Sequence, residues 1–285
     1  MSRAVLAAYL ACSLIWGTTW FAIRECIGKD AYPTLAALAL RFGIAFLILL
    51  PIAIRARPWP RGVAWLYLVL AGVLDAAAYT LVYLGEERIS GGLAAVVYGT
   101  QPLILALLLQ VFRIEKLSSR HILGALISLA GVGVLFLDRL DVSTEQAIGI
   151  VLVIGSVLMA TGYSMVMKRQ TTGGLIATTV FIGVTAAVVG VVALVAREPM
   201  PWPPPLVPTI ALLYLAVVGS VIAFLLYFWL LDRTSLVVTS TLVFVFPLVA
   251  LATDALFERE IALGPRAYLG AGITLAGLAV TLRRR

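Results

Sequence analysis

The sequence predicts an all-α integral membrane protein with ten transmembrane helices, arranged as two inverted five-helix repeats. Of its 285 residues, 62% are hydrophobic and 12% are charged, and the mean hydropathy is +1.07. Soluble domains carry about 45–50% apolar and about 25% charged residues. The charges lie in short clusters separated by apolar runs of about twenty residues, the length of a helix that crosses a bilayer. The second half also repeats part of the first, and the short loops leave no space for a soluble catalytic domain.

Five helix-sized apolar runs account for the first half of the chain. The first follows Arg3 and continues past Cys12 to Ile23, which is longer than the apolar core of a signal peptide. The fourth contains Pro102, which lacks an amide proton and crowds the carbonyl of Tyr98, so we expect a bend. The fifth is rich in Gly and Ala, which let helix backbones approach closely. The predicted helices cover residues 4–23, 32–54, 62–85, 89–111 and 121–137.

The second half contains five further apolar runs of similar length. The ninth run carries Pro247 at the depth that Pro102 has in the fourth, and we expect a bend beside the carbonyl of Val243. The tenth run has the same Gly and Ala pattern as the fifth. These helices are predicted at residues 147–167, 174–196, 206–231, 235–256 and 264–282.

An internal repeat explains this likeness between the halves. The stretch LGALISLAGVGV at 123–134 recurs as LGAGITLAGLAV at 269–280, which is 146 positions later. At an offset of 145, the matched pairs include Arg88 with Arg233, Ser90 with Ser235, Pro102 with Pro247, and Glu115 with Glu260. We therefore predict a first five-helix repeat at 1–142 and a second at 143–285. Because five is odd, the second repeat must start from the opposite face of the membrane, which inverts its topology.

The net charge of +7 is explained by orientation in a membrane rather than by nucleic-acid binding. If the N-terminus is cytoplasmic, 13 of the 21 Lys and Arg residues fall on the inside and 7 on the outside, and Arg41 alone lies within a span. Cytoplasmic loops carry an excess of Lys and Arg. Both termini are therefore expected in the cytoplasm.

The residues resemble the drug/metabolite transporter superfamily, and within it the ten-helix EamA-type exporters. The resemblance rests on Trp16-Gly17-Thr18-Thr19 with Phe21 and Arg24, Arg41-Phe42, the segment from Pro102 to Glu115, and Gly124-Ala125 with Ala130-Gly131. It covers essentially the whole chain, although Trp16-Gly17 corresponds only to Met159-Ala160 in the second repeat. The resemblance implies an exporter of amino acids or other small metabolites in a bacterial-type inner membrane, with no cofactor.

Two deep charges are the first candidate substrate-binding residues. A cation at the depth of Arg41 costs at least about 2.5–3.5 kcal/mol on insertion scales, so it should face a partner or a water-filled cavity. Asp75 in the third span is also deep and is its expected partner. Two interpretations stay open: a structural pair that orients the helices, or groups that contact a substrate carboxylate, a substrate amine or a coupling proton.

Deep aromatic and amide side chains form the second candidate group. Trp16 and Trp20 are four residues apart, so they share one helix face, and the same holds for Tyr79 and Tyr83. Buried phenols need hydrogen-bond partners, so such a set indicates a cavity with apolar walls and a few polar groups. The alternative is the ordinary placement of Trp and Tyr at membrane interfaces. The remaining members are Tyr98, Gln101 and Tyr163, with Phe224, Tyr227 and Phe228 ranked second.

Pro102 and Pro247 are interpreted either as hinges that open two gates or as static kinks. No nucleotide-binding motif is present, His121 has no neighbouring ligand cluster, and Cys12 and Cys26 are too far apart for a disulfide or a zinc site. We therefore predict no enzyme, no metal and no nucleic-acid partner.

The expected function is export of small metabolites, and neutral or aromatic amino acids are the first candidates. The alternatives are a nucleoside, a sugar derivative or a drug-like cation as solute, or a membrane subunit that does not transport. The expected partners are the small-molecule substrate and the lipid bilayer. The expected assembly is a monomer or a weak homodimer.

Overall fold

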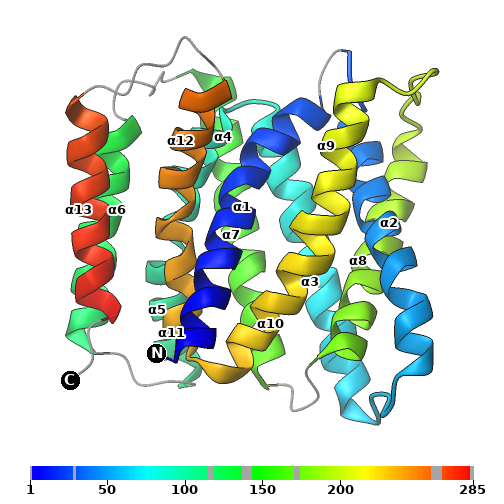
Figure 1. Cartoon of the computed structure of the whole chain (residues 1–285), viewed down its shortest axis with the longest axis horizontal. Helices are drawn as coiled ribbons and strands as arrows, with labels where there is room; N and C mark the ends of the chain where they lie inside the picture. Colours follow the sequence, from blue (N-terminus) through cyan, green and yellow to red (C-terminus); the bar gives the residue numbers. More distant parts are fainter. Residues whose placement is uncertain are drawn as a thin grey trace.

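The computed structural model describes residues 2–27, 30–113, 118–136, 143–169, 174–257 and 265–282. Within these residues the chain forms a bundle of helices that run side by side between two faces, and the only β-structure is an isolated bridge between Ile27 and Tyr32 (Figure 1). Glu115 and Glu260, which the repeat pairs, lie outside the described residues. The boundary between 142 and 143 is at the edge of one of these gaps.

Within the described residues, ten apolar segments occur in the predicted order, and the all-helical membrane fold is confirmed. Seven are long and apolar enough to cross a membrane: α1 (Arg3–Cys26), α2 (Thr34–Arg55), α3 (Val63–Glu86), α4 with α5 (Gly91–Tyr98 and Gln101–Phe112), α7 (Thr144–Arg169), α8 (Leu175–Ala196), and α9 with α10 (Leu206–Ala216 and Ala223–Arg233). The other three apolar segments are α6 (Ser119–Phe136), α11 with α12 (Leu236–Ser240 and Phe246–Phe257), and α13 (Pro265–Leu282).

Two serines matched by the repeat begin equivalent helices. The Ser90 hydroxyl accepts a hydrogen bond from the Leu93 amide at 3.2 Å at the start of α4, and the Ser235 hydroxyl accepts one from Val238 at 3.2 Å at the start of α11. A serine at this position satisfies an amide that has no partner inside the helix. The repeated residue therefore sets the same local structure twice.

The two spans that carry the repeat-matched prolines Pro102 and Pro247 are each interrupted just before the proline. The fourth is broken at Gly99 and Thr100, between α4 and α5, and the ninth contains a 3₁₀ turn at Thr241–Phe244 between α11 and α12. Pro102 and Pro247 cannot donate to the carbonyl four residues earlier, so the backbone tightens there. A third irregularity, a π-helical turn at Val217–Ile222 between α9 and α10, has no proline and was not predicted.

The helices of the two halves pack against each other across the bundle. The most extensive pairings are α6 with α13, α3 with α7, and α2 with α8, while α1 packs on α9, α10 and α12. In the α6–α13 pair the backbones approach so closely that a Cβ atom on Gly131 would lie 2.4 Å from the Thr274 nitrogen, and one on Gly277 would lie 2.4 Å from the Ser128 nitrogen. Small residues therefore permit this contact, as predicted for the fifth and tenth spans.

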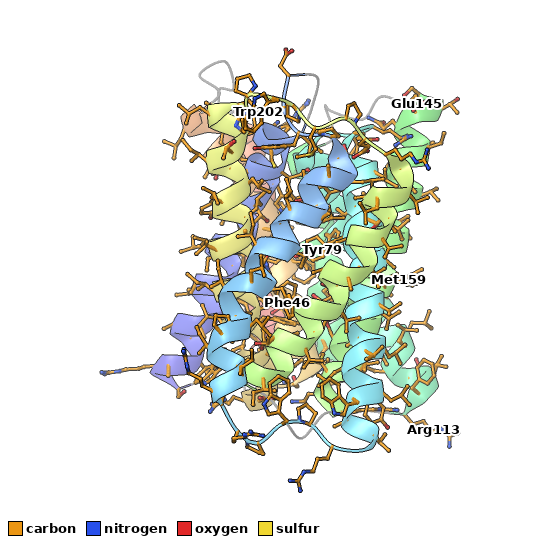
Figure 2. The ribbon with its side chains drawn as sticks, turned by 90° about the vertical axis from the view of Figure 1, so that its right-hand side faces the viewer. Phe46, Tyr79, Arg113, Glu145, Met159 and Trp202 are labelled. Atoms are coloured by element: carbon orange, nitrogen blue, oxygen red, sulfur yellow. The ribbon has the colours of Figure 1, made fainter. Side chains whose placement is uncertain are left out.

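Helix α1 starts, and helix α13 ends, at the same face of the bundle (Figure 1). Helix α1 starts at that face, whereas α7, the first helix of the second half, starts at the opposite face, where Glu145 and Trp202 are seen in Figure 2. Arg113 lies at the face that carries the termini. The first helices of the two halves thus start from opposite faces of the bundle.

Candidate functional site

A cavity of about 80 Å³ lies in the centre of the bundle. Its walls come from α1, α3, α4, α5, α7 and α10 and from the interrupted ninth span. Ligand pockets commonly measure roughly 300–1,000 Å³, so this conformation admits only a small solute or a few waters. The lining residues are Trp16, Thr19, Trp20, Ile23, Ala78, Tyr79, Val82, Tyr98, Gln101, Ala160, Tyr163, Tyr227, Thr239, Leu242, Val243 and Phe246.

Six of the nine residues selected from the sequence line this cavity: Trp16, Trp20, Tyr79, Tyr98, Gln101 and Tyr163. The other three, Arg41, Asp75 and Tyr83, are fully buried and do not contribute to its wall. Tyr79 connects the two groups, because it lines the cavity and also accepts a hydrogen bond from Arg41. The charged side chains of Arg41 and Asp75 therefore lie behind the cavity wall, separated from the cavity by one side chain. Figure 2 shows Tyr79 at mid-height in the bundle.

Arg41 joins three helical segments, and each nitrogen of its guanidinium has a hydrogen-bond partner. Its partners are Ser220 Oγ (2.9 Å from Nε), Tyr83 Oη (3.1 Å from Nη1), and the Gly219 carbonyl and Tyr79 Oη (3.2 and 3.4 Å from Nη2). Gly219 and Ser220 belong to the π-helical turn, where a widened backbone leaves carbonyl groups that need donors. Arg41 therefore holds this irregular segment against α2 and α3.

The predicted pairing of Arg41 with Asp75 is wrong. Within the described residues the Asp75 carboxylate takes no ion pair, and its hydrogen bond comes from the Thr185 hydroxyl on α8 at 2.9 Å. Its second oxygen has no hydrogen-bond partner in the described part of the chain. The reason is geometric: the Arg41 guanidinium is directed toward the π-helical turn, and Asp75 is directed toward α8.

Aromatic rings from both halves enclose the cavity. The Trp16 ring lies 5.0 Å from the Tyr227 ring, and the Trp20 ring lies 5.4 Å from the Tyr98 ring, both measured between centroids. The phenols are anchored to α7, because Tyr98 hydrogen-bonds Ser156, and Tyr227 donates to Ser164 at 2.8 Å. Such rings give rigid apolar walls with hydroxyl groups at their edges.

One donor on the wall lacks a partner. The Trp20 indole nitrogen is buried and makes no hydrogen bond within the described residues, and the Trp20 side chain lines the cavity. Leaving such a donor unpaired costs about 1–3 kcal/mol. A solute that offers an acceptor at this position would recover that free energy.

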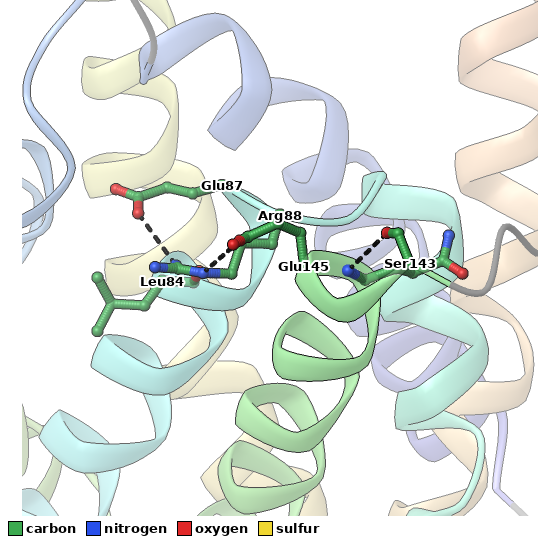
Figure 3. Close-up of polar contacts among 6 residues, drawn as sticks. Leu84, Glu87, Arg88, Ser143 and Glu145 are labelled. Atoms are coloured by element: carbon green, nitrogen blue, oxygen red, sulfur yellow. Dashed lines mark hydrogen bonds and ion pairs between the residues drawn. The ribbon is translucent and has the colours of Figure 1, made fainter.

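A polar cluster connects α3 and α7 at the face opposite the termini (Figure 3). Arg88 donates to the Leu84 carbonyl at 2.7 Å and lies 3.5 Å from Glu145 and 3.4 Å from Glu87. Beside it, Ser143 accepts a hydrogen bond from the Gln146 amide at the start of α7. Because Glu145 is largely exposed, the ion pair contributes about 0–1 kcal/mol, which allows it to open and close readily.

Several residues of the site were not selected from the sequence. Thr19, Thr239, Leu242 and Phe246 line the cavity, and Ser220 and Thr185 hold the two buried charges. Ser220 carried a usable signal, because it follows Asp75 by the repeat offset of 145. Among the described residues, no group of three or more His, Cys, Asp or Glu side chains is arranged to hold a metal ion.

Apolar helices that are long enough to cross a membrane and that pack around a central cavity are typical of a multi-span membrane transport protein. The chain belongs to the EamA-like transporter family, whose model matches residues 2–137 and again 147–283. This family consists of transporters, so the chain is a membrane transporter and not an enzyme. The resemblance inferred from its motifs is thereby confirmed.

Relatives from several organisms cover most of the chain. Protein PecM of Dickeya dadantii is 29% identical over 258 residues, which is 89% of this chain and 84% of PecM. The inner membrane transporter YedA of Escherichia coli K12 is 29% identical over 249 residues, or 86% of this chain and 80% of YedA. A solved crystal structure with 20% identity superposes with a TM-score of 0.78 over 99% of this chain and 98% of its own length, and it supports the fold.

Proposed function

We propose that this protein is an inner-membrane secondary transporter that exports small metabolites by alternating access, with neutral and aromatic amino acids as the first candidates. The observation that carries the substrate class is the cavity wall, whose lining combines aromatic rings, hydroxyl groups and the Gln101 amide and contains no charged side chain. Such a wall fits a solute with no net charge. The direction of transport is taken from the likeness to exporters.

Alternating access is supported by the arrangement of the two halves. The family model matches twice, and the first helices of the two halves start from opposite faces of the bundle (Figure 1). Inverted repeats give a transporter two similar ways to pack, each open to one side, around a site near the midplane. The substrate-binding set that we propose is Trp16, Trp20, Tyr79, Tyr98, Gln101 and Tyr163. Pro102 and Pro247 are proposed as the hinges of the fourth and ninth spans.

Counterflow in proteoliposomes tests the proposal directly. Vesicles are loaded with one unlabelled amino acid at high concentration, and entry of the same labelled compound is followed at equal pH on both sides. Transient accumulation is expected for phenylalanine, tyrosine, tryptophan or leucine, and not for lysine or glutamate. No accumulation of any amino acid by folded protein would contradict the assignment.

Trp20→Phe is the sharpest single test of the site. The substitution keeps the aromatic ring and removes the unpaired indole N–H, so a solute that accepts this hydrogen bond should bind about tenfold more weakly. The expected result is a raised KM in counterflow with an unchanged maximal rate. Trp65→Phe is the matched control, because Trp65 is exposed and stacks on Trp59 away from the cavity. Equal effects of both substitutions would contradict the assignment of Trp20.

A nucleoside is the second candidate solute. The Gln101 amide and the Trp20 N–H can pair with the edge of a nucleobase, and the surrounding rings can stack on its face. The same counterflow assay, loaded with nucleosides, sugar derivatives or organic cations, ranks these solutes against the amino acids.

A further inference from the structure

The Asp75 carboxyl is buried near the cavity with incomplete bonding. The residue is 0% exposed, one of its oxygens accepts from Thr185, and the other has no hydrogen-bond partner within the described residues. Arg41, the cation on the neighbouring helix α2, donates its hydrogen bonds to other groups. The carboxyl therefore lacks the partners that an ionised side chain in a membrane interior needs.

The internal repeat relates the two hydrogen bonds that hold the buried charges. Ser220 follows Asp75 by 145 positions, and Thr185 follows Arg41 by 144. The Arg41–Ser220 and Thr185–Asp75 hydrogen bonds thus join equivalent helices, once between α2 and the π-helical turn and once between α8 and α3. Each nitrogen of the Arg41 guanidinium has a hydrogen-bond partner, whereas one Asp75 oxygen has none within the described residues, so only Asp75 keeps an open site.

The groups that interact electrostatically with Asp75, or hydrogen-bond to it, come from α3 itself and from the helices α2, α4, α7 and α8 that pack against α3. Helix α2 contributes Arg41 and α3 itself contributes Tyr79, while α4 contributes Tyr98 and α7 contributes Tyr163. Helix α8 contributes the uncharged Thr185. The phenols are neutral near pH 7, so Arg41 is the one fixed charge in this set. Tyr79, Tyr98 and Tyr163 also line the cavity, which places Asp75 one side chain away from it.

We propose that Asp75 binds and releases a proton in each transport cycle and so couples solute movement to a transmembrane proton gradient. This inference rests on the proposed transport function and deepens it. The free carboxylate oxygen takes a proton from water in the cavity when the cavity is open to one face, forming an O–H bond. It returns that proton to water at the other face. The solute binds to the cavity wall and not to this carboxyl. Proton uptake at Asp75 and solute occupancy of the cavity alternate during the cycle, so the solute and the proton move in opposite directions.

The test compares two assays on the same proteoliposomes. Counterflow at equal pH measures solute exchange, which needs no net proton movement. Accumulation under an imposed difference of one pH unit, with the membrane potential clamped, measures coupling. For one proton per solute, wild-type protein should reach a concentration ratio of up to about ten. Asp75→Asn keeps the shape and the Thr185 hydrogen bond but cannot ionise, so it should retain counterflow while its ratio falls to one. Asp232→Asn, at the end of α10, is the matched control and should behave as wild type.

Every outcome decides the proposal. Accumulation by Asp75→Asn equal to wild type, or wild-type exchange without any accumulation, overturns it. Infrared spectroscopy supplies a readout that needs no solute. It is measured in a Glu86→Gln background, because both Glu86 carboxylate oxygens are also buried without a hydrogen-bond partner within the described residues. A protonated carboxyl band at neutral pH should be present when Asp75 is kept and absent after Asp75→Asn. Absence of that band when Asp75 is kept also overturns the proposal. If no solute gives counterflow with wild type while the infrared band is present, the proposed substrates are wrong, whereas the assignment of Asp75 as the proton-binding residue is supported.

Discussion

At the scale of single residues, two deep charges that were treated as a pair have different neighbours. Arg41 stabilises the π-helical turn through Gly219 and Ser220, whereas Asp75 is held by Thr185 alone. Arg41 donates hydrogen bonds to a backbone carbonyl and a hydroxyl group of the π-helical turn, so its role is structural. A carboxyl with an open oxygen is available for chemistry.

Replacement of Arg41 should therefore destabilise the protein rather than alter specificity. Arg41→Gln removes the charged group that donates these hydrogen bonds and leaves its buried acceptors unpaired. The free energy of unfolding should therefore fall by about 3 kcal/mol or more. Thermal unfolding in detergent measures the loss. Arg233→Gln is the control, because Arg233 lies at the end of α10 over the Trp229 ring and should change stability by less than about 1 kcal/mol. A stable Arg41→Gln protein with altered solute preference would instead place Arg41 in the binding site.

Residue spacing predicted much of the cavity but not the partners of its charges. Trp16 and Trp20 share a helix face, as do Tyr79 and Tyr83, so the periodicity of a helix was enough to group them. Which helix stands opposite depends on packing, and Tyr83 consequently faces Arg41 rather than the cavity. The contact of Asp75 with α8 depends on tertiary structure in the same way.

At the scale of helices, the interruptions separate into two kinds. Those in the fourth and ninth spans precede Pro102 and Pro247 and could be predicted, because proline removes a backbone donor. The π-helical turn at Val217–Ile222 has no such residue, and its freed Gly219 carbonyl is satisfied by Trp16 and Arg41 from other helices. The position of this turn therefore depends on residues of other helices, and the local sequence does not predict it.

The proline interruptions yield a prediction about rate. If they are hinges, Pro102→Ala and Pro247→Ala should each let the helix continue and slow counterflow several-fold, with little change in KM, because the cavity wall is kept. Stopped-flow counterflow across a range of solute concentrations separates the two parameters. Pro51→Ala in α2 is the matched control, since Pro51 also lies inside a helix but on its exposed side. An unchanged rate in both variants would identify the interruptions as static kinks.

At the scale of the whole molecule, the order of the ten helices could be predicted because length and hydropathy alone determine which segments span a bilayer. The two matches of the family model agree with the repeat that was read from LGALISLAGVGV and LGAGITLAGLAV. The start of α1 and the end of α13 lie at one face (Figure 1), which agrees with an even number of spans. The size and shape of the cavity could not be predicted, because they depend on how side chains of several helices pack together.

Orientation in the membrane is the prediction at this scale. The excess of Lys and Arg predicts that the face with both termini is cytoplasmic. Fluorescent-protein fusions at either end should therefore fluoresce in bacterial cells, and alkaline phosphatase fusions at the same ends should be inactive. Insertion of the phosphatase near Trp202, at the opposite face, should give activity (Figure 2). The reverse pattern would show that the molecule inserts the other way round.

The two native cysteines on α1 can report when the helices around them separate during transport. Cys12 and Cys26 are free thiols with 0% exposure, and they lie about 21 Å apart along the helix axis. A water-soluble alkylating reagent can react with either thiol only while the helices around it have separated. Cys12 lies nearer the face with the termini and Cys26 nearer the opposite face. The reaction rates of single-cysteine variants, measured from each side of the membrane, would therefore time the opening of each half of the pathway without any introduced label site.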